Sequence, residues 1–313
     1  MLSIIIPVYN EEKSIHALYC QLLEVIEKLH ETYEVIFIDD GSIDESLHIL
    51  KQIKQEDTNV RIFSFRKNQG KAEALNFGFT KAKGDYIATL DADLQDKPSE
   101  IPKLLEKIKE GWDVVCGWRK NRQDSFFKVF SSLLFNFFTR VFWGLALHDY
   151  NGGLKLYKKD AAKSLHLYGG MHRFIPILLY QQGFTVSEIE VVHQKRAYGK
   201  SKYGFSKIFK ELPDMFTMLF LTRYSKRPLH FFSMVGSILF LLGVLILGYL
   251  SIIHFQGTAI GRRPLLFLGM LLVLSGFQVL FTGFLADLII SIFYSKRGEN
   301  SEKEKFLLKY SSE

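Results

Sequence analysis

The chain has 313 residues, which corresponds to about two domains on the usual range of ~100–200 residues each. With 48% hydrophobic and 23% charged residues and only 7 prolines, it cannot be a disordered chain, a collagen or a proline-rich linker. Its two cysteines are too few for a disulfide framework, and its net charge of +7 suits nucleic acid, an anionic membrane or phosphorylated substrates.

The first 120 residues alternate short apolar runs with amphipathic stretches. Strands are expected at residues 2–8, 34–40, 60–65, 85–93 and 113–119, and helices at residues 14–31, 44–55, 71–82 and 98–110. This alternation predicts an α/β fold with a mostly parallel sheet that helices cover on both faces. Ligands of such sheets bind beyond the carboxyl ends of the strands, so the polar residues found there are candidate site residues.

Carboxylates gather at two of these strand ends. Asp39 and Asp40 close the second strand, and Asp91 and Asp93 close the fourth. Like charges at one edge repel each other unless a cation lies among them. If residues 91–93 are extended, both side chains face one side and offer the hard oxygen ligands that Mg²⁺ or Mn²⁺ prefers. The alternatives are a plain surface loop for this D-x-D pattern and helix capping for Asp39 and Asp40.

Residues 125–147 are rich in phenylalanine and contain only two charged residues, Lys128 and Arg140. They are predicted to form one or two amphipathic helices in the plane of the lipid headgroups. A buried core helix is the alternative.

Residues 191–210 contain six basic residues and no acidic one: Lys195, Arg196, Lys200, Lys202, Lys207 and Lys210. In a loop that also contains glycines, Arg196, Ser201 and Lys202 have the chemistry of phosphate ligands. Lys207 and Lys210 adjoin apolar residues, so residues 205–222 are expected to lie at a membrane surface. Because these charges lie close to long apolar runs, nucleic acid is not the expected partner.

Two apolar runs without any formal charge follow, at residues 229–253 and 264–286. A spanning helix needs roughly 20 such residues, which predicts transmembrane helices at 229–253 and 264–290; two buried core helices are the alternative. Basic residues flank the outer ends of the pair. The chain is therefore expected to be a multi-pass protein of the plasma membrane, with a cytoplasmic domain at residues 1–225 and a cytoplasmic tail at 296–313.

Four motifs stand in a characteristic order: PVYNEE at residues 7–12, DDGSID at 39–44, NQGKAEALNFG at 68–78 and DADLQDKP at 91–98. Together they resemble family 2 glycosyltransferases of the GT-A fold. HRFIP at 172–176, KRAYGKSKYG at 195–204 and the terminal apolar pair are similar to polyprenyl-phosphate glycosyltransferases, which include dolichyl-phosphate mannose synthases and undecaprenyl-phosphate enzymes of bacteria.

The resemblance implies roles for matching positions. The nucleotide would lie against Pro7, Tyr9, Glu11 and Asp40, with Lys71 near its pocket. The divalent metal on the diphosphate, Mg²⁺ or Mn²⁺, would be held by Asp91, Asp93 and Gln95. Catalysis would involve Asp91, Asp93, Arg119, Arg196, Ser201 and Lys202, of which the last three belong to a basic loop that closes over the phosphates. Residues 151–155, NGGLK, depart from the relatives' usual pattern, which implies a different acceptor loop.

The resemblance further implies a membrane-bound, metal-dependent, inverting hexosyltransferase. It would move a sugar from a UDP- or GDP-linked donor to a polyprenyl phosphate such as undecaprenyl phosphate, for glycosylation of the cell envelope. Its expected partners are the nucleotide sugar, the polyprenyl phosphate and membrane lipids, without nucleic acid, and a homo-oligomer is left open. The alternatives are another lipid acceptor, such as diacylglycerol, and a non-catalytic membrane adaptor that retains a glycosyltransferase fold.

Overall fold

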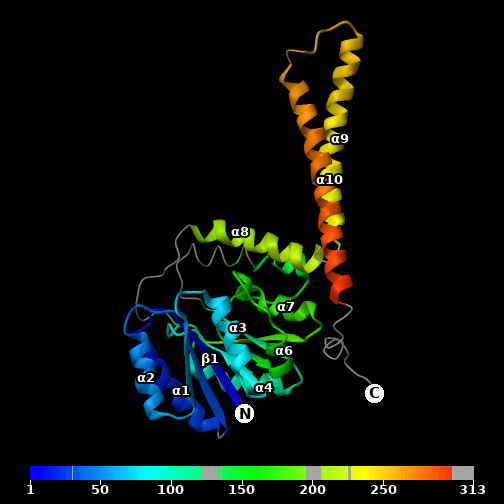
Figure 1. The fold of residues 1–313 in the computed structure, drawn as a ribbon. Coiled ribbons are helices and arrows are strands. Elements are labelled where there is room, and N and C mark those ends of the chain that lie inside the picture. The colour runs from blue at the N-terminus through cyan, green and yellow to red at the C-terminus, as the bar shows by residue number, and fades with distance from the viewer. Residues whose placement is uncertain are drawn as a thin grey trace. The chain divides into compact units, whose positions relative to one another are not determined.

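The structure, a computed structural model, describes residues 1–29, 31–120, 133, 136–137, 139–194, 206–224, 227–261 and 263–297. The chain divides into two units, Met1–Met218 and Leu219–Glu313. The first contains a β-sheet flanked by helices, and the second contains two long helices (Figure 1).

A seven-stranded sheet with the order β3-β2-β1-β4-β6-β5-β7 runs through the first unit. Its strands are β1 (Leu2–Val8), β2 (Tyr33–Asp39), β3 (Val60–Ser64), β4 (Tyr86–Thr89), β5 (Val114–Trp118), β6 (Lys155–Lys158) and β7 (Val186–Glu190). Strands β3, β2, β1 and β4 are parallel neighbours, and β5 is parallel to β7. Only β6 runs antiparallel to the strands on either side of it. The predicted mostly parallel α/β sheet is confirmed.

Helices cover both faces of this sheet. They are α1 (Ile15–Leu29), α2 (Ser46–Glu56), α3 (Lys71–Lys81), α4 (Ile101–Lys109), α6 (Lys159–Lys163) and α7 (Ile175–Gln181), with short 3₁₀ turns η1 (Pro98–Glu100) and η2 (Met171–Phe174). A further helix, α8 (Ser206–Leu219), follows β7 in the chain. Helices α1, α2 and α4 share one core with Ile4 and Ile6 of β1. Helix α3 covers the other face, where a Cβ on Gly78 would lie 2.5 Å from a methyl group of Ile5 (Figure 1).

The apolar character of β1 follows from this two-sided cover. Ile4, Ile5 and Ile6 are all 0% exposed, although successive side chains of a strand point to opposite faces. Burying each of them contributes about 1.5–3 kcal/mol. A continuously apolar strand is therefore stable here, whereas a strand in a sheet with one face open to solvent would alternate apolar and polar residues.

Two strands were not predicted, and one was predicted too long. Strand β6 has the sequence KLYK, whose flanking lysines hide the apolar pattern, and β7 has the sequence VSEIE. Strand β4 ends at Thr89, so the expected extension through residue 93 is wrong. The chain turns there instead, which changes the geometry of the D-x-D pattern.

The described part of residues 125–147 has one apolar face that the protein leaves open. Leu133, Phe137 and Val141 recur every four residues and are 60–62% exposed, whereas Thr139 and Trp143 are 0% and 7% exposed. Side chains four positions apart lie on one face of a helix, so this stretch has an exposed apolar face, and its amphipathic character and position at the headgroups stay predictions. Residues 125–132, 134–135 and 138 lie outside the described residues.

Helix α8 shows a similar division where its side chains are described. Met215 and Met218 are 6% and 1% exposed, and Phe216 between them is 63% exposed. Asp214 accepts a hydrogen bond from Arg173 of η2 at 2.9 Å, which joins the helix to η2. The position of this apolar face at a lipid surface stays a prediction.

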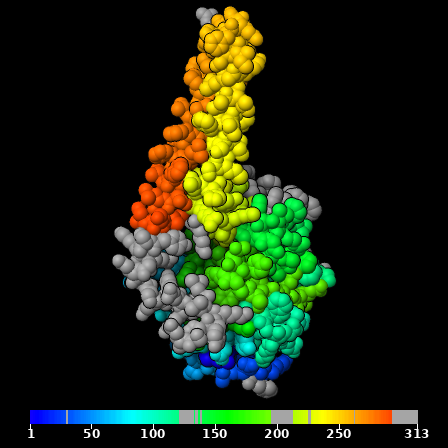
Figure 2. All heavy atoms as spheres, turned by 90° about the vertical axis from the view of Figure 1, so that its right-hand side faces the viewer, coloured from blue at the N-terminus to red at the C-terminus, as the bar shows by residue number. Residues whose placement is uncertain are grey.

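The second unit begins with a π-helical turn, η3 (Phe220–Tyr224), and continues as α9 (Pro228–Phe255) and α10 (Pro264–Arg297). A Cβ on Gly236 of α9 would lie 2.8 Å from the carbonyl oxygen of Gly276 in α10. Glycine at this crossing lets the two backbones approach closely, as in packed membrane helices. Figure 2 shows α9 and α10 side by side.

Both helices, Pro228–Phe255 and Pro264–Ile292, are long and apolar enough to cross a membrane, and the most apolar 18-residue windows within them have mean hydropathies of 2.5 and 2.2. Only 11% of the most apolar window of each helix is buried, and Leu245 and Leu274 are each 68% exposed. A helix that is apolar on all sides needs an apolar environment, so this pair indicates association with a membrane.

Candidate active site

The carboxyl ends of β2, β1 and β4 meet at one edge of the sheet because these strands are parallel neighbours. Tyr9 follows β1, Asp40 follows β2 and Asp91 follows β4 shortly after its end. The topology therefore brings the predicted nucleotide residues and the predicted metal residues to the same edge.

The loop after β1 is held against the start of α2. The backbone N–H of Glu11 donates to Ser46 Oγ at 2.9 Å, and Asn10 adopts the left-handed conformation with φ +55°. Asparagine tolerates this conformation better than most residues, which allows the sharp turn. Pro7, at the end of β1, and Tyr9 and Glu11, in this loop, are all partly buried.

Asp40 shapes the approach to α3. Its two carboxylate oxygens accept hydrogen bonds from the backbone N–H groups of Gln69 at 2.7 Å and Gly70 at 3.0 Å. Burial raises the pKa of Asp40 above its ordinary value, although these two donors oppose the shift. The carboxylate thereby orders the turn that begins α3 and positions Lys71. Both donors precede Lys71, the first residue of α3, so Asp40 does not cap the N–H groups of the helix itself, and its contact with a nucleotide stays a prediction.

Lys71 and Asp91 form the central ion pair of the site. Lys71 Nζ lies 2.5 Å from Asp91 Oδ1 and 2.7 Å from Oδ2. Their side chains are 35% and 33% exposed, so the pair is open to solvent on one side. Burial acts to raise the pKa of Asp91, but the charge of Lys71, assisted by Lys155 and Arg119, holds it below its ordinary value. Asp91 is therefore a carboxylate at neutral pH.

The segment after Asp91 is a turn and not an extension of β4. Residues 92 and 93 lie in the turn, Leu94 has a left-handed φ of +61°, and the backbone N–H of Gln95 donates to Asp93 Oδ1 at 3.2 Å. The expectation that Asp91 and Asp93 face one side because they are extended is thus wrong. Three potential oxygen ligands nevertheless remain within one short turn, since Gln95 follows directly.

This turn is joined to the segment that precedes the basic loop. The backbone N–H of Gln194 donates to the Gln95 carbonyl at 2.9 Å, and the Gln95 amide donates to the Gln194 carbonyl at 3.4 Å. Next to them, His193 Nδ1 lies 3.4 Å from Asp96 Oδ1, with the two side chains 2% and 4% exposed. Residues 91–96 and the start of the basic segment therefore form one connected structure.

The oxygen donors of the turn fit a hard dication that needs further ligands. Asp91, Asp93 and Gln95 supply carboxylate and amide oxygens, the types that Mg²⁺ and Mn²⁺ prefer. Within the described residues, no three His, Cys, Asp or Glu side chains converge as a metal site. Magnesium is usually held by one or two carboxylates together with substrate phosphates, so the turn suits a metal that a diphosphate completes.

Arg119, which follows β5, is engaged by an acidic partner that the sequence did not suggest. Its Nε and Nη2 donate to the two oxygens of Asp149 at 2.6 and 3.0 Å, and the side chains are 11% and 3% exposed. Burial opposes the guanidinium charge, but Asp149 outweighs it and raises the pKa of Arg119. Arg119 is thus held in place by a bidentate ion pair, with its positive charge directed at the same site as Asp91.

The NGGLK segment contributes more to the site than the sequence indicated. A Cβ on Gly153 would lie 2.6 Å from Asp91 and 2.8 Å from Asp96 Oδ2, so only glycine fits between these carboxylates. Lys155 is 3% exposed, and its ammonium donates to the Gly152 carbonyl. Burial lowers the pKa of Lys155 from its ordinary value. The two adjacent glycines were the signal in the sequence that backbone and side chains approach closely here.

Several predicted residues cannot be placed. Arg196, Ser201 and Lys202, together with the tail from residue 298, lie outside the described residues. Their assignment to phosphate binding and to the cytoplasm stays a prediction.

The first unit has the fold of solved nucleotide-sugar enzymes. A structure of glucosyl-3-phosphoglycerate synthase from Mycobacterium tuberculosis in complex with Mn²⁺ and uridine-diphosphate-glucose superposes with a TM-score of 0.53 at 18% identity, over 71% of this chain and 78% of that chain. At this identity the likeness shows the fold alone, which confirms the expected GT-A architecture.

Relatives with similar sequences cover nearly the whole chain. Dodecaprenyl-phosphate galacturonate synthase of Rhizobium johnstonii is 37% identical over 94% of this chain and 88% of its own length. Undecaprenyl-phosphate 4-deoxy-4-formamido-L-arabinose transferase of Proteus mirabilis is 35% identical over 94% of this chain and 90% of its own length. Residues 3–165 also match the family described as Glycosyl transferase family 2. With the sheet, the carboxylate edge and these relatives in agreement, the chain belongs to glycosyltransferase family 2 and is related to its polyprenyl-phosphate sugar transferases.

Proposed function

We propose that this protein transfers a hexosyl group from a nucleotide diphosphate sugar to a polyprenyl phosphate, such as undecaprenyl phosphate, with inversion at the anomeric carbon. The observation that carries the proposal is the Lys71–Asp91 pair beside the oxygen-rich turn, at the ligand-binding edge of a family 2 domain. Two relatives named for transfer to dodecaprenyl and undecaprenyl phosphate, and two apolar helices of membrane length, support the lipid acceptor.

In this proposal the nucleotide lies along the loops that follow β1 and β2. Tyr9 offers an aromatic face, with Pro7 near the end of β1 before it and Glu11 in the same loop after it. Asp40 keeps the turn before α3 in place, so that the ammonium of Lys71 is directed at the diphosphate. Mg²⁺ or Mn²⁺, held by Asp91, Asp93 and Gln95, would neutralise charge on the leaving diphosphate.

The acceptor needs little activation. A phosphate monoester has a second pKa of about 6 and is already an anionic nucleophile near neutral pH, so no strong general base is required. The chain has to align two anionic groups for attack on the anomeric carbon. We assign this to Arg196, Ser201 and Lys202 of the basic loop, supported by the charge of the fixed Arg119. The connection of Gln95 to Gln194 links the donor turn to the segment that leads into this loop.

Membrane association places the enzyme where its acceptor is. We propose that α9 and α10 span the plasma membrane, that residues 1–225 are cytoplasmic, and that α8 and the apolar face at Leu133, Phe137 and Val141 contact the headgroup region. The product would be a lipid-linked sugar for glycosylation of the cell envelope.

The test uses the full chain, purified in detergent with Mg²⁺. It is incubated with labelled UDP-galacturonate, UDP-4-deoxy-4-formamido-L-arabinose, UDP-glucose or GDP-mannose, and with undecaprenyl phosphate or diacylglycerol. We expect labelled polyprenyl-phosphate sugar from one of the six-carbon donors, and product from the arabinose donor alone would contradict the hexosyl assignment. Product on diacylglycerol alone would mean that diacylglycerol, and not polyprenyl phosphate, is the acceptor. The absence of product with every donor and acceptor would favour a non-catalytic adaptor.

A further inference from the structure

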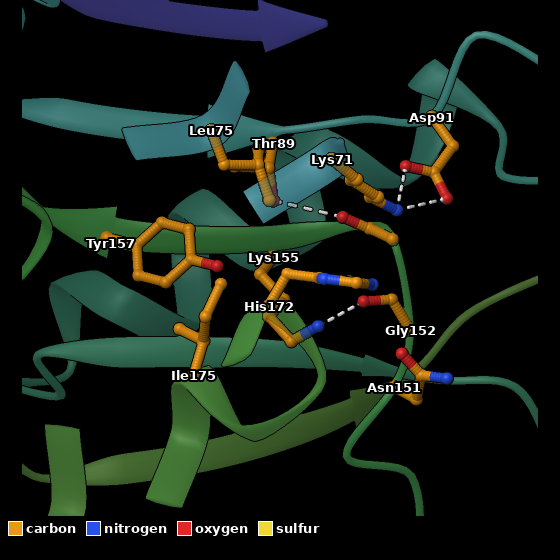
Figure 3. A pocket seen from close by; sticks show the side chains of 11 residues that line it. Lys71, Leu75, Thr89, Asp91, Asn151, Gly152, Lys155, Tyr157, His172 and Ile175 are labelled. Carbon is orange, nitrogen blue, oxygen red and sulfur yellow. Dashed lines mark hydrogen bonds and ion pairs between the residues drawn. The ribbon is translucent and has the colours of Figure 1, made fainter. Parts of the chain in front are cut away.

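A small cavity lies behind the Lys71–Asp91 pair (Figure 3). Helix α3 provides Lys71 and Leu75, strands β4 and β6 provide Thr89, Lys155 and Tyr157, and η2 and α7 provide His172 and Ile175. The partly exposed ion pair forms its outer end, and Tyr157, which is 0% exposed, forms its inner end. A group that enters beside Asp91 would therefore point toward the phenol of Tyr157.

Two buried polar atoms in this lining make no well-formed hydrogen bond among the described residues: Nδ1 of His172 and the hydroxyl oxygen of Tyr157, which has only the Thr89 hydroxyl nearby. The neighbouring Thr89 hydroxyl donates to the Gly153 carbonyl at 3.0 Å. Buried polar groups are nearly always paired, because an unpaired one loses its hydrogen bonds to water without replacement. Two such atoms in the wall of one cavity indicate that a ligand group completes them.

The chemistry of the walls limits what that group can be. Burial, followed by the charges of Lys71 and Arg173, lowers the pKa of His172 to about 3, so the imidazole is neutral near pH 7. A neutral ring nitrogen accepts or donates one hydrogen bond, and a tyrosine hydroxyl does both. The ammonium of Lys155 also lines the cavity and only donates. These walls suit a small group that both donates and accepts, such as a hydroxyl or an amide.

The order of the strands indicates which part of the substrate enters. In the proposed function, the nucleotide lies after β1 and β2, and the diphosphate lies at Asp91 after β4. The cavity continues in the same direction, from β4 toward β6. The part of a nucleotide sugar beyond its diphosphate is the sugar ring.

We propose that this cavity receives a hydroxyl or amide substituent of the sugar that is transferred, and that Tyr157 and His172 select donors carrying it. The proposal rests on the proposed function and extends it by assigning sugar specificity to residues of β6 and η2. Under this proposal both residues determine which donor sugar is accepted, and neither takes part in breaking the bond between the sugar and the diphosphate. It also explains why the side chains of Tyr157 and His172 remain polar although they are buried beside Leu75 and Ile175.

The test compares Tyr157→Phe with the unchanged protein. This replacement removes only the hydroxyl, so the stability of the free protein should not fall. The measurement is kcat/KM for the fastest donor of the panel above and for its analogues that each lack one hydroxyl or amide substituent of the sugar. We expect one analogue to be about a hundredfold or more poorer than the intact donor in the unchanged protein, because a site built around a hydrogen bond rejects a substrate that lacks it. In Tyr157→Phe that preference should shrink by about tenfold or more.

The matched control is Tyr150→Phe, a tyrosine that is also 0% exposed but donates its hydroxyl to the Leu145 carbonyl. It should lower the melting temperature and leave the donor preference unchanged. His172→Leu provides a second variant that should also reduce the preference. If both Tyr157→Phe and His172→Leu keep the donor preference of the unchanged protein, the proposal about the cavity is wrong. If the intact donor is still turned over in that case, the proposed function stands. Absence of turnover in the unchanged protein would overturn both.

Discussion

Asp93 makes a local structural hydrogen bond and also has a predicted role as a metal ligand. Replacing one carboxylate oxygen with an amide nitrogen tests the two roles separately. Its Oδ1 accepts the backbone N–H of Gln95, a bond that an asparagine oxygen can also accept. We therefore expect Asp93→Asn to keep its melting temperature and to lose turnover, because a neutral amide is a poorer ligand for a hard dication. Activity and thermal unfolding in detergent measure the two effects.

The control for this substitution is Asp85→Asn, which removes a carboxylate that is 72% exposed and paired with the N-terminus. It should remain active. Full activity of Asp93→Asn, or undiminished activity of the unchanged protein in excess EDTA, would remove the metal from the proposed mechanism.

Arg119 offers a second prediction at the residue scale. Arg119→Ala leaves the buried Asp149 carboxylate without its positively charged partner, which should destabilise the protein by about 3–5 kcal/mol. Replacing both, as Arg119→Met with Asp149→Leu, should restore most of that stability because no buried charge is left unpaired. If the arginine charge also acts on the phosphates, the restored double variant should still be at least about tenfold slower.

The readouts are the melting temperature and kcat/KM of the same preparations. A double variant that is both stable and fully active would show that this ion pair is structural only. The pair was not predictable from the sequence, because Arg119 and Asp149 are separated by 30 positions and only the position of the segment before β6 brings them together.

At the scale of elements, the positive charge of the basic loop at residues 195–204 has two possible explanations, phosphate binding and attraction to an anionic membrane. If Arg196 and Lys202 bind phosphates, removing either should cost a charge-assisted hydrogen bond of about 1.5–3 kcal/mol, or tenfold to a hundredfold in kcat/KM. If they only attract an anionic membrane, each should contribute about 1 kcal/mol and depend on lipid charge. In neutral micelles with a soluble short-chain prenyl phosphate, the membrane contribution is absent.

We expect Arg196→Ala and Lys202→Ala to be severely impaired in those micelles. Lys207→Ala in α8 serves as the matched control, since it should be close to the unchanged protein. Equal and small effects in all three variants would mean that the basic loop is a membrane-facing surface without a phosphate site.

At the scale of the whole molecule, the apolar pair α9 and α10 predicts a topology. Basic residues outside both helices favour a cytoplasmic location for both chain ends, with the connection between the helices on the far side. Single cysteines introduced at positions 258 and 300 can be labelled with a membrane-impermeant maleimide on intact cells. The background variant is Cys20→Ser, because Cys20 is exposed whereas Cys116 is buried.

Labelling is expected at position 258 and not at position 300. The reverse pattern would invert the orientation and place the Asp91 site outside the cell, where a cytoplasmic nucleotide sugar could not reach it. Labelling at both positions would contradict a hairpin that crosses the membrane twice.

The sequence by itself determined the class of the fold, the family and the chemical character of the site. Continuously apolar strands, amphipathic helices and two runs of membrane length are local patterns, and each is set by the energetics of burying its own residues. The edge at which Tyr9, Asp40 and Asp91 gather followed from the rule for parallel strands, without coordinates.

Only the tertiary structure decided how the site is held together. The connection of Gln95 to Gln194, the Arg119–Asp149 pair and the cavity at Tyr157 and His172 depend on contacts between residues far apart in the chain. The short strand β6 shows the reason most clearly: its KLYK sequence has no strong pattern of its own and becomes a strand because β4 and β5 pair with it on both sides. Local propensity is weak where the partners come from elsewhere, so packing decided the geometry on which substrate selection rests.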